Sequence, residues 1–359
     1  MSSFEVKVSK IENIFPIDGA DKIELVLIDD YKSVVQKNNY KVGDNVIYIP
    51  EASLIPQNIL EEMNLVGKLA GSNKNRVKAI RIRGQVSQGL IYPNKENWPL
   101  GFDCKEILGI EKFIPTVPEK FASSNTLNVG VEKTISYDIE NIKKYKTLFD
   151  ENDDVVITEK IHGTNFCAGI YFNKETLESE NIVHSKGLGQ KGLAIEICEE
   201  TLNNTYVKTS IEKDLHNKLR KVFPNQTVFI LGEIFGNGVQ KGFHYGNFDK
   251  SDYRVFDIHL GDRYTGRWAN DSELDEFCKL LELKRVPILY RGKFSKEITL
   301  SVTSGKETVS GKSLHMREGC VVRTQIDQGT IIGRKQLKSI SDEYLLRGKG
   351  NDEEETEFE

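Results

Sequence analysis

The stretch VVITEKIHGTNFCAG, at residues 155–169, is the most informative part of this sequence. Its β-prone run VVIT ends in Glu159 and Lys160, and the residues GTN then turn the chain before an apolar run resumes. A lysine held at a strand end can be desolvated and placed beside other cations, which lowers its pKa and makes its amine nucleophilic. Taken alone, the stretch is equally consistent with a surface lysine before a hairpin turn.

Five later segments carry residue types that phosphate chemistry needs. They read SKG at 185–187, FILGEIFGNGVQ at 229–240, YRVFDI at 253–258, REGCVVR at 317–323 and RKQLKSIS at 334–341. With EKIHGTN, and in this order, they resemble the motifs of the covalent nucleotidyltransferases, specifically the nick-sealing RNA ligases of the second class. The resemblance implies an ATP-dependent RNA ligase that joins RNA 3′-hydroxyl and 5′-phosphate ends, with a nicked duplex as the expected substrate. It also implies a covalent lysyl-AMP intermediate and an adenylylated RNA 5′ end.

The same resemblance implies roles for individual residues. The expected catalytic residues are Lys160, His162 and Lys338. The expected nucleotide-binding residues are Glu159, Lys160, Asn165, Lys186, Glu233, Phe256, Glu318, Lys335 and Lys338. The expected ligands of Mg²⁺ (or Mn²⁺) are Glu233 and Glu318. Within these sets, Lys160 is the nucleophile, Glu159 and Phe256 recognise the adenine of ATP, and Asn165 positions a phosphate or the RNA terminus.

The sequence departs from the family pattern at Lys186 and Gln336, and a third position, His162, separates the RNA ligases from related enzymes. Lys186 stands where members more often have arginine, so it keeps the charge but loses the forked geometry of a guanidinium. Gln336 occupies the first lysine of the usual Lys-x-Lys motif, and Lys335, one residue away, is a candidate substitute. His162 stands where DNA ligases and capping enzymes usually have aspartate, which favours the RNA ligase branch; a solvent-facing turn histidine is the alternative.

These residue types fit one reaction. Attack on an α-phosphate needs a neutral amine in line with the leaving pyrophosphate, together with groups that neutralise charge on the phosphoryl oxygens. Lys338, with Lys335 and Lys186, would stabilise that charge, and the two glutamates would hold the metal directly or through its waters. Ordinary salt-bridged carboxylates, and a core phenylalanine at Phe256, are the competing interpretations.

The predicted fold class is α+β, with an N-terminal OB-like β-barrel followed by an ATP-grasp-like nucleotidyltransferase domain. Residues 1–113 contain the β-prone runs FEVKVSKI, KIELVLI, NVIYIP, VKAIRI and QGLIYP. We expect a linker at 114–134, the catalytic domain at 135–347 and a disordered acidic tail at 348–359. Helical spacing of apolar residues indicates a helix within 211–222, and a short helix is expected within 138–149. The residues after Lys338 are too few for the OB domain that DNA ligases and capping enzymes place there.

Composition bounds the class of protein without naming a partner. The formal net charge is -5, but the tail alone supplies Asp352, Glu353, Glu354, Glu355, Glu357 and Glu359. The rest of the chain is therefore close to neutral, which leaves room for a local basic groove such as the charged run at 74–83. No apolar run approaches the ~20 residues of a membrane span, and the five cysteines form no CxxC pair. We expect a cytoplasmic, monomeric protein with reduced thiols.

Two phosphate-binding patterns are decoys. KGLGQKG at 186–192 satisfies GxGxxG, but the preceding NIVHSK is short and polar for a buried parallel strand. SGKETVSGKS at 304–313 has Lys306 where a phosphate loop needs glycine, so we predict a flexible, turn-rich loop there. Two functional alternatives stay open: a guanylyltransferase-like capping enzyme, and a non-catalytic RNA-binding protein.

Overall fold

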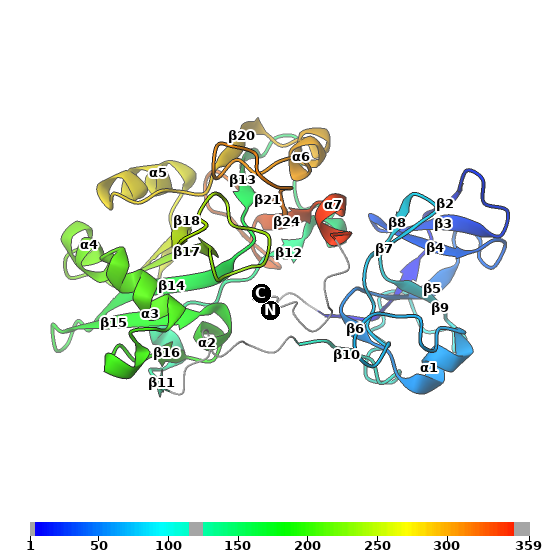
Figure 1. The fold of residues 1–359 in the computed structure, drawn as a ribbon, viewed down its shortest axis with the longest axis horizontal. Coiled ribbons are helices and arrows are strands. Elements are labelled where there is room, and N and C mark those ends of the chain that lie inside the picture. Colours follow the sequence, from blue (N-terminus) through cyan, green and yellow to red (C-terminus); the bar gives the residue numbers. More distant parts are fainter. Residues whose placement is uncertain (1–3, 115–124, 348–359) are drawn as a thin grey trace.

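The computed structural model describes residues 4–114 and 125–347. They form an N-terminal domain, blue to cyan in Figure 1, and a larger C-terminal domain, green to red. No helix among these residues is long and apolar enough to cross a bilayer. The predicted acidic tail and positions 115–124 of the predicted linker lie outside the described residues.

The N-terminal domain is built from short antiparallel strands. Its elements are β1 (Lys7–Lys10), β2 (Asn13–Pro16), β3 (Ile23–Ile28), β4 (Tyr31–Gln36), β5 (Asn45–Ile49), β6 (Ser53–Leu54), α1 (Gln57–Glu62), β7 (Ile80–Ile82), β8 (Gln85–Ser87), β9 (Leu90–Pro93) and β10 (Glu111–Lys112). The sheets have the orders β1-β5-β9, β2-β3-β4, β7-β8 and β10-β6. Each of the five predicted β-prone runs contains a strand, so that prediction is confirmed.

Strand β5 organises the core of this domain because both of its faces are buried. Ile47 and Ile49 pack into one apolar cluster, and Val46 and Tyr48 pack into another. Alternate side chains of a strand point to opposite faces, so a strand with no polar alternation must lie between two cores.

The C-terminal domain contains two five-stranded sheets. The first has the order β12-β24-β21-β13-β20, and the second has the order β15-β14-β17-β18-β19. The strands of the first are β12 (Glu140–Asn141), β13 (Asp154–Lys160), β20 (Ile288–Lys293), β21 (Gly319–Thr324) and β24 (Gln336–Ile340). Those of the second are β14 (Thr164–Phe172), β15 (Ser179–Ser185), β17 (Val228–Gly236), β18 (Ser251–Leu260) and β19 (Arg267–Trp268). All pairings in both sheets are antiparallel except β12 with β24.

Helices pack on these sheets, most of them on the outer faces, and confirm the α+β class (Figure 1). They are α2 (Lys186–Gln190), α3 (Thr205–Glu212), α4 (Leu215–Val222), α5 (Asp271–Leu280), α6 (Lys296–Thr303) and α7 (Asp342–Leu345). The minor strands are β11 (Thr126–Asn128), β16 (Leu193–Ile195), β22 (Gly329–Thr330) and β23 (Gly333–Arg334). The helical pattern predicted at 211–222 corresponds to the end of α3 and the whole of α4.

The chain passes from one sheet to the other directly after Lys160. Strand β13 ends at this residue and β14 begins at Thr164, so three residues make the crossing. Gly163 permits it, because a Cβ at this position would lie 2.1 Å from the backbone oxygen of Ile234. The turn predicted from the sequence is therefore the point where the two sheets meet.

Two predicted boundaries need correction. The helix expected within 138–149 is limited to a 3₁₀ turn, Ile142–Lys144, because the preceding residues form β12 and pair with β24. The expected linker is also too long at its C-terminal end. Strand β11 pairs with β16, so residues 126–128 already belong to the C-terminal domain.

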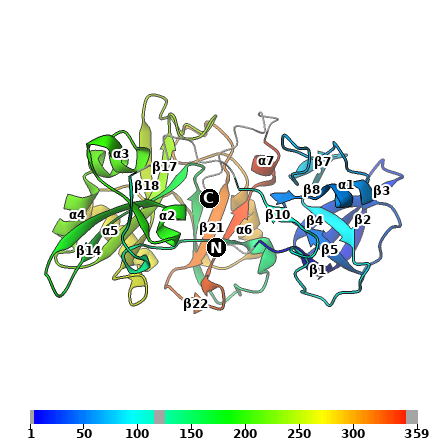
Figure 2. The ribbon, with the colours of Figure 1, turned by 90° about the horizontal axis from the view of Figure 1, so that it is seen from below.

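Side chains on the two domains contact each other directly. Lys143 donates a hydrogen bond to the Gln88 side chain. Lys146 and Glu12 form an ion pair at 2.6 Å. Lys296 and Asp30 form another at 2.8 Å. Helix α7 lies on the side of the C-terminal domain that faces the N-terminal one (Figures 1 and 2). The lysines of these contacts come from the C-terminal domain and their polar partners from the N-terminal domain.

Candidate active site

Two cavities meet at the end of β13. The smaller, about 100 Å³, lies between the two sheets of the C-terminal domain, and the larger, about 260 Å³, lies between the two domains. Lys160, Glu233 and Lys338 line both. These three residues therefore mark the passage from the smaller cavity to the larger one.

Lys160 stands at this junction with a carboxylate as its partner. Its side chain is 22% exposed, and its Nζ donates a hydrogen bond to Oε1 of Glu318 at 2.6 Å. Glu318 precedes β21, whose first residue, Gly319, is the register partner of Lys160. Antiparallel pairing of β13 with β21 thus brings together two residues far apart in the sequence.

The smaller cavity has an aromatic wall and polar ends. Phe256 projects from β18 and packs on Tyr137 with ring centroids 5.0 Å apart. Glu159, from β13, is 2% exposed and lines the same cavity. A flat aromatic face beside a buried acceptor is suited to a planar heterocycle that carries hydrogen-bond donors.

Lys186 and Asn165 also line the smaller cavity. The Lys186 ammonium, at the start of α2, donates a hydrogen bond to Asp138 at 3.1 Å. Burial alone would raise the pKa of Asp138, but the Lys186 ammonium outweighs burial and the pKa is lowered. Asn165 on β14 lies opposite Glu233 on β17. All of the predicted nucleotide-binding residues except Glu318 and Lys335 therefore line the smaller cavity.

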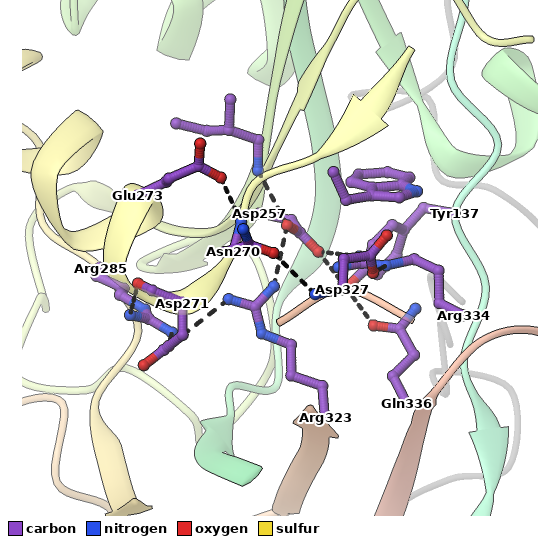
Figure 3. A network of polar contacts seen from close by, with 12 residues as sticks. Tyr137, Asp257, Asn270, Asp271, Glu273, Arg285, Arg323, Asp327, Arg334 and Gln336 are labelled. Carbon is purple, nitrogen blue, oxygen red and sulfur yellow. Dashed lines mark hydrogen bonds and ion pairs between the residues drawn. The ribbon is translucent and has the colours of Figure 1, made fainter. Parts of the chain in front are cut away.

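A network of polar contacts joins the two sheets beside this cavity (Figure 3). Asp257 on β18 accepts hydrogen bonds from Arg323 on β21 at 3.2 Å, from Tyr137 at 3.1 Å and from Arg334. Arg323 and Tyr137 both line the smaller cavity. A buried carboxylate is stable when it is paired and hydrogen-bonded, so this network fixes the spacing of the cavity walls.

His162 faces the larger cavity and is held from several sides. Its backbone N–H donates to the Tyr245 hydroxyl at 2.7 Å, and its Nδ1 lies 3.0 Å from the Tyr344 hydroxyl. Its ring also packs edge-on against Phe243 at 4.7 Å. The alternative of a solvent-facing turn histidine is therefore wrong, because the His162 side chain is only 12% exposed.

Glu233 and Glu318 are candidate metal ligands in chemistry as well as in position. The described residues contain no group of three or more His, Cys, Asp or Glu side chains that could hold a metal ion. Mg²⁺ nevertheless commonly binds proteins through one or two carboxylates and keeps water or phosphate oxygens as its other ligands. Two carboxylates beside a cavity open to a phosphate group fit such a site.

Lys335 was predicted to bind the nucleotide, but the structure places it outside the site. Its ammonium forms an ion pair with Asp153 at 2.6 Å and lies over the Phe149 ring, and it lines neither cavity. It therefore does not take the place of the lysine missing at Gln336. The Gln336 side chain instead accepts a hydrogen bond from the Tyr137 hydroxyl at 3.2 Å.

Several residues of the site carried no readable signal in the sequence. Asp138 and Tyr137 lie in a segment predicted to precede or begin a helix, and Thr308 lies in a decoy motif. Tyr344 follows the last recognised motif. The segment YDIEN, at residues 137–141, contains charged and aromatic residues. Only the pairing of β12 with β24 reveals that this segment reaches the cavity.

Comparisons with known proteins agree with this geometry. The RNA ligase family model matches residues 153–340, more than half of the chain. The chain belongs to the RNA ligase family. An OB-fold domain model matches residues 5–94, which confirms the predicted fold of the N-terminal domain. The prediction of an RNA ligase with an N-terminal OB domain is therefore confirmed.

Solved structures share both domains of this RNA ligase. A mutant of the Naegleria gruberi RNA ligase with ATP and Mn has a TM-score of 0.77 at 22% identity, covering 94% of this chain and 97% of that chain. A second mutant, with AMP and Mn, has a TM-score of 0.78 at 22% identity, covering 96% and 98%. The same ligase with PPi gives 0.76 at 21% identity, also covering 96% and 98%. These comparisons show a common fold along nearly the whole chain.

The charge state of Glu233 gives a prediction about stability. Burial raises its pKa from 4.5 to about 8, with opposing effects from Lys160, which lowers it, and Glu318, which raises it. An acid whose pKa is raised by folding loses stability as the pH increases from the unfolded to the folded value. Glu233→Gln should therefore raise the Tm of the metal-free protein by a few degrees above about pH 8 and much less near pH 5. Calorimetry with a chelator present checks this; an equal gain at both pH values would contradict it.

Proposed function

We propose that this RNA ligase is ATP-dependent and seals nicked duplexes, joining an RNA 3′-hydroxyl to a 5′-phosphate through a lysyl-AMP intermediate on Lys160. One observation carries the proposal: Lys160 lies where the smaller cavity meets the interdomain cavity. A nucleotide with its base in the smaller cavity would place its α-phosphate beside Nζ of Lys160. Its β- and γ-phosphates would then extend into the larger, interdomain cavity.

The reaction has three balanced steps. First, Lys160 Nζ loses a proton and attacks the α-phosphorus of ATP, a P–N bond forms and the bond to pyrophosphate breaks. Second, an oxygen of the RNA 5′-phosphate attacks the same phosphorus and releases the lysine. Third, the RNA 3′-hydroxyl attacks the 5′-phosphate and expels AMP. The leaving groups are pyrophosphate, the Lys160 amine, which takes up a proton, and AMP in turn. In all three steps negative charge gathers on phosphoryl oxygens, so positioning and charge neutralisation contribute most of the catalysis.

The site residues divide these tasks. Phe256 stacks on the adenine while Glu159 accepts a hydrogen bond from it. Lys338 and Lys186 neutralise phosphate oxygens, and Asn165 orients the phosphate or the RNA terminus. The predicted catalytic role of His162 is kept as part of this proposal, since its ring lines the cavity into which the RNA end would enter.

Lys160 must lose a proton before it reacts. Glu318 Oε1 lies 2.6 Å from Nζ and holds the amine in place. Glu233 and Glu318 would hold Mg²⁺ or Mn²⁺. When bound, the metal would neutralise negative charge on the α-phosphate, and its positive charge near Nζ would favour the unprotonated amine. Residues on both sides of the lysine thus hold its position while its charge changes. Because every one of these groups comes from one chain, we propose that the enzyme acts as a monomer.

The larger cavity supports a role for the OB domain in holding nucleic acid. Arg76 and Lys78, from the basic run predicted at 74–83, line this cavity, and Arg76 is largely buried. Arg81 and Arg83, from the same run, are exposed at the β7–β8 hairpin. Basic side chains gathered on an OB-fold domain are suited to a phosphate backbone.

Incubation with ATP and a divalent cation tests the proposal. The intact protein is expected to gain the mass of one AMP through an acid-labile phosphoramidate on Lys160, located by peptide mass spectrometry. GTP is expected to give no adduct, which separates the ligase from a capping-type guanylyltransferase. A chain that forms no adduct with either nucleotide would instead fit a non-catalytic RNA-binding protein and would overturn the proposal.

A further inference from the structure

The two oxygens of the Glu159 carboxylate have different surroundings. Oε2 accepts hydrogen bonds from the backbone N–H of Thr308 at 2.8 Å and from its hydroxyl at 2.5 Å. Arg317 Nε lies 3.7 Å from the same oxygen. Oε1 is buried, with no hydrogen-bond partner among the described residues. Since Glu159 lines the smaller cavity, Oε1 is the oxygen left for a ligand there.

The segment that supplies Thr308 is the decoy phosphate motif at 304–313, and it is an ordered loop. Glu307 is fully buried and organises it. The Glu307 carboxylate accepts hydrogen bonds from the backbone N–H of Ser310 at 2.9 Å, from the Ser310 hydroxyl, and from the backbone N–H of Leu314 at 3.0 Å. These hydrogen bonds tie the loop to Glu307 and place the neighbouring Thr308 beside Glu159.

We propose that Thr308 is a positioning residue for nucleobase selection, which fixes Glu159 so that Oε1 accepts a hydrogen bond from the exocyclic amine of a 6-aminopurine. The proposal rests on the proposed function, because it requires the base of ATP in the smaller cavity. An ionised carboxylate accepts hydrogen bonds and cannot donate them, so it pairs with a 6-amino group and repels a 6-oxo group. Thr308 thereby contributes to selection of adenine over guanine without touching the base.

A fixed carboxylate matters because the last torsion of a glutamate is soft. This torsion has a broad energy profile, so a carboxylate held by nothing else would rotate and share its oxygens between many directions. Two donors on one oxygen remove that freedom. Thr308 is itself exposed, so the loss of its hydroxyl leaves no buried void and is expected to preserve the fold.

The test compares two nucleotides that differ only in the amine. Rates of lysyl-AMP formation from ATP, and of the corresponding adduct from purine riboside triphosphate, are measured at subsaturating nucleotide for the wild type and Thr308→Val. The ratio of the two kcat/KM values should fall by about tenfold in the variant, the loss expected for one hydrogen bond to a charged group. The rate with purine riboside triphosphate should stay unchanged, and Thr308→Ser should restore the wild-type ratio.

Ser304→Ala is the matched control, because it removes an exposed hydroxyl from the same segment without removing a hydrogen bond to Glu159 or Glu307. It should leave the ratio unchanged. An equal fall of both rates in Thr308→Val, or the same loss of selectivity in Ser304→Ala, would overturn the inference and indicate general loosening of the loop. Absence of any adduct in the wild type would instead overturn the proposed function, so the two failures are distinguishable.

Discussion

Replacing Lys160 by alanine is expected to abolish the AMP adduct and to lower the sealing of a nicked RNA duplex by at least about a thousandfold. The reason is that no other lysine of the site is placed to replace the nucleophile. Lys186 is held by Asp138 at 3.1 Å, and Lys338 lies on β24 across the cavity. Loss of the covalent intermediate removes the route by which ATP activates the RNA end. Mass spectrometry and a gel assay of nick sealing measure the two effects.

Two controls make this result specific. Lys335→Ala removes a lysine that is paired with Asp153 outside both cavities, so it should keep most of the wild-type activity. Lys160→Ala should also still seal a nick whose 5′ end already carries AMP, because the last step uses no lysine nucleophile. An adduct on the alanine variant, or an equal loss with the pre-adenylylated nick, would contradict the assignment.

The positions of Lys160 and its neighbours could be predicted because they follow from local patterns. The run VVIT is β-branched and apolar, and a strand rich in such residues fits the buried centre of a sheet. Val155, Val156 and Ile157 are completely buried, and β13 ends at the predicted lysine. The other motifs, recognised by their order along the sequence, predicted Glu233, Phe256 and Glu318. Each of these residues lines one or both cavities.

Contacts between distant segments could not be predicted in the same way. Asp138 reaches Lys186 only because β12 adds to the sheet beside β24, and a two-residue strand has no periodicity to detect. The short helix predicted within 138–149 missed this strand, and the segment forms a 3₁₀ turn after it. Thr308 reaches Glu159 across a long sequence separation through an ordered loop whose sequence indicates only turns.

The position of Lys335 outside the site, in contrast, could have been predicted from the sequence. Side chains alternate along a strand, so Gln336 and Lys338 share one face of β24 while Leu337 points to the other. Leu337 is buried in the core that contains Phe149, and the Lys335 ammonium lies over the Phe149 ring. The alternation alone therefore places Lys335 on the opposite face from Lys338, and it excludes the substitution suggested by the nearby sequence position.

The second large effect concerns the sugar at the 3′-hydroxyl end. Replacing the last two ribonucleotides on this side of a nick by deoxynucleotides is expected to slow sealing by about a hundredfold, whereas a DNA 5′-phosphate strand should change the rate by less than about threefold. The 2′-hydroxyl both donates and accepts hydrogen bonds and favours A-form geometry, so a protein can recognise it directly. Single-turnover sealing of matched nicks, all pre-adenylylated, isolates the step that uses the 3′ end.

Phosphate contacts cannot produce this discrimination, because RNA and DNA present the same phosphates. Arg76 and Lys78, on the OB-domain wall of the larger cavity, are expected to set affinity for both nucleic acids. Lys78→Ala should therefore weaken binding of RNA-ended and DNA-ended nicks by the same factor, measured at one salt concentration because such contacts are screened. Asn165 is the candidate for ribose contact, since its amide can donate and accept. Equal sealing rates for all-DNA and RNA-ended nicks would exclude specificity for RNA 3′ ends, while the covalent chemistry of Lys160 would stand.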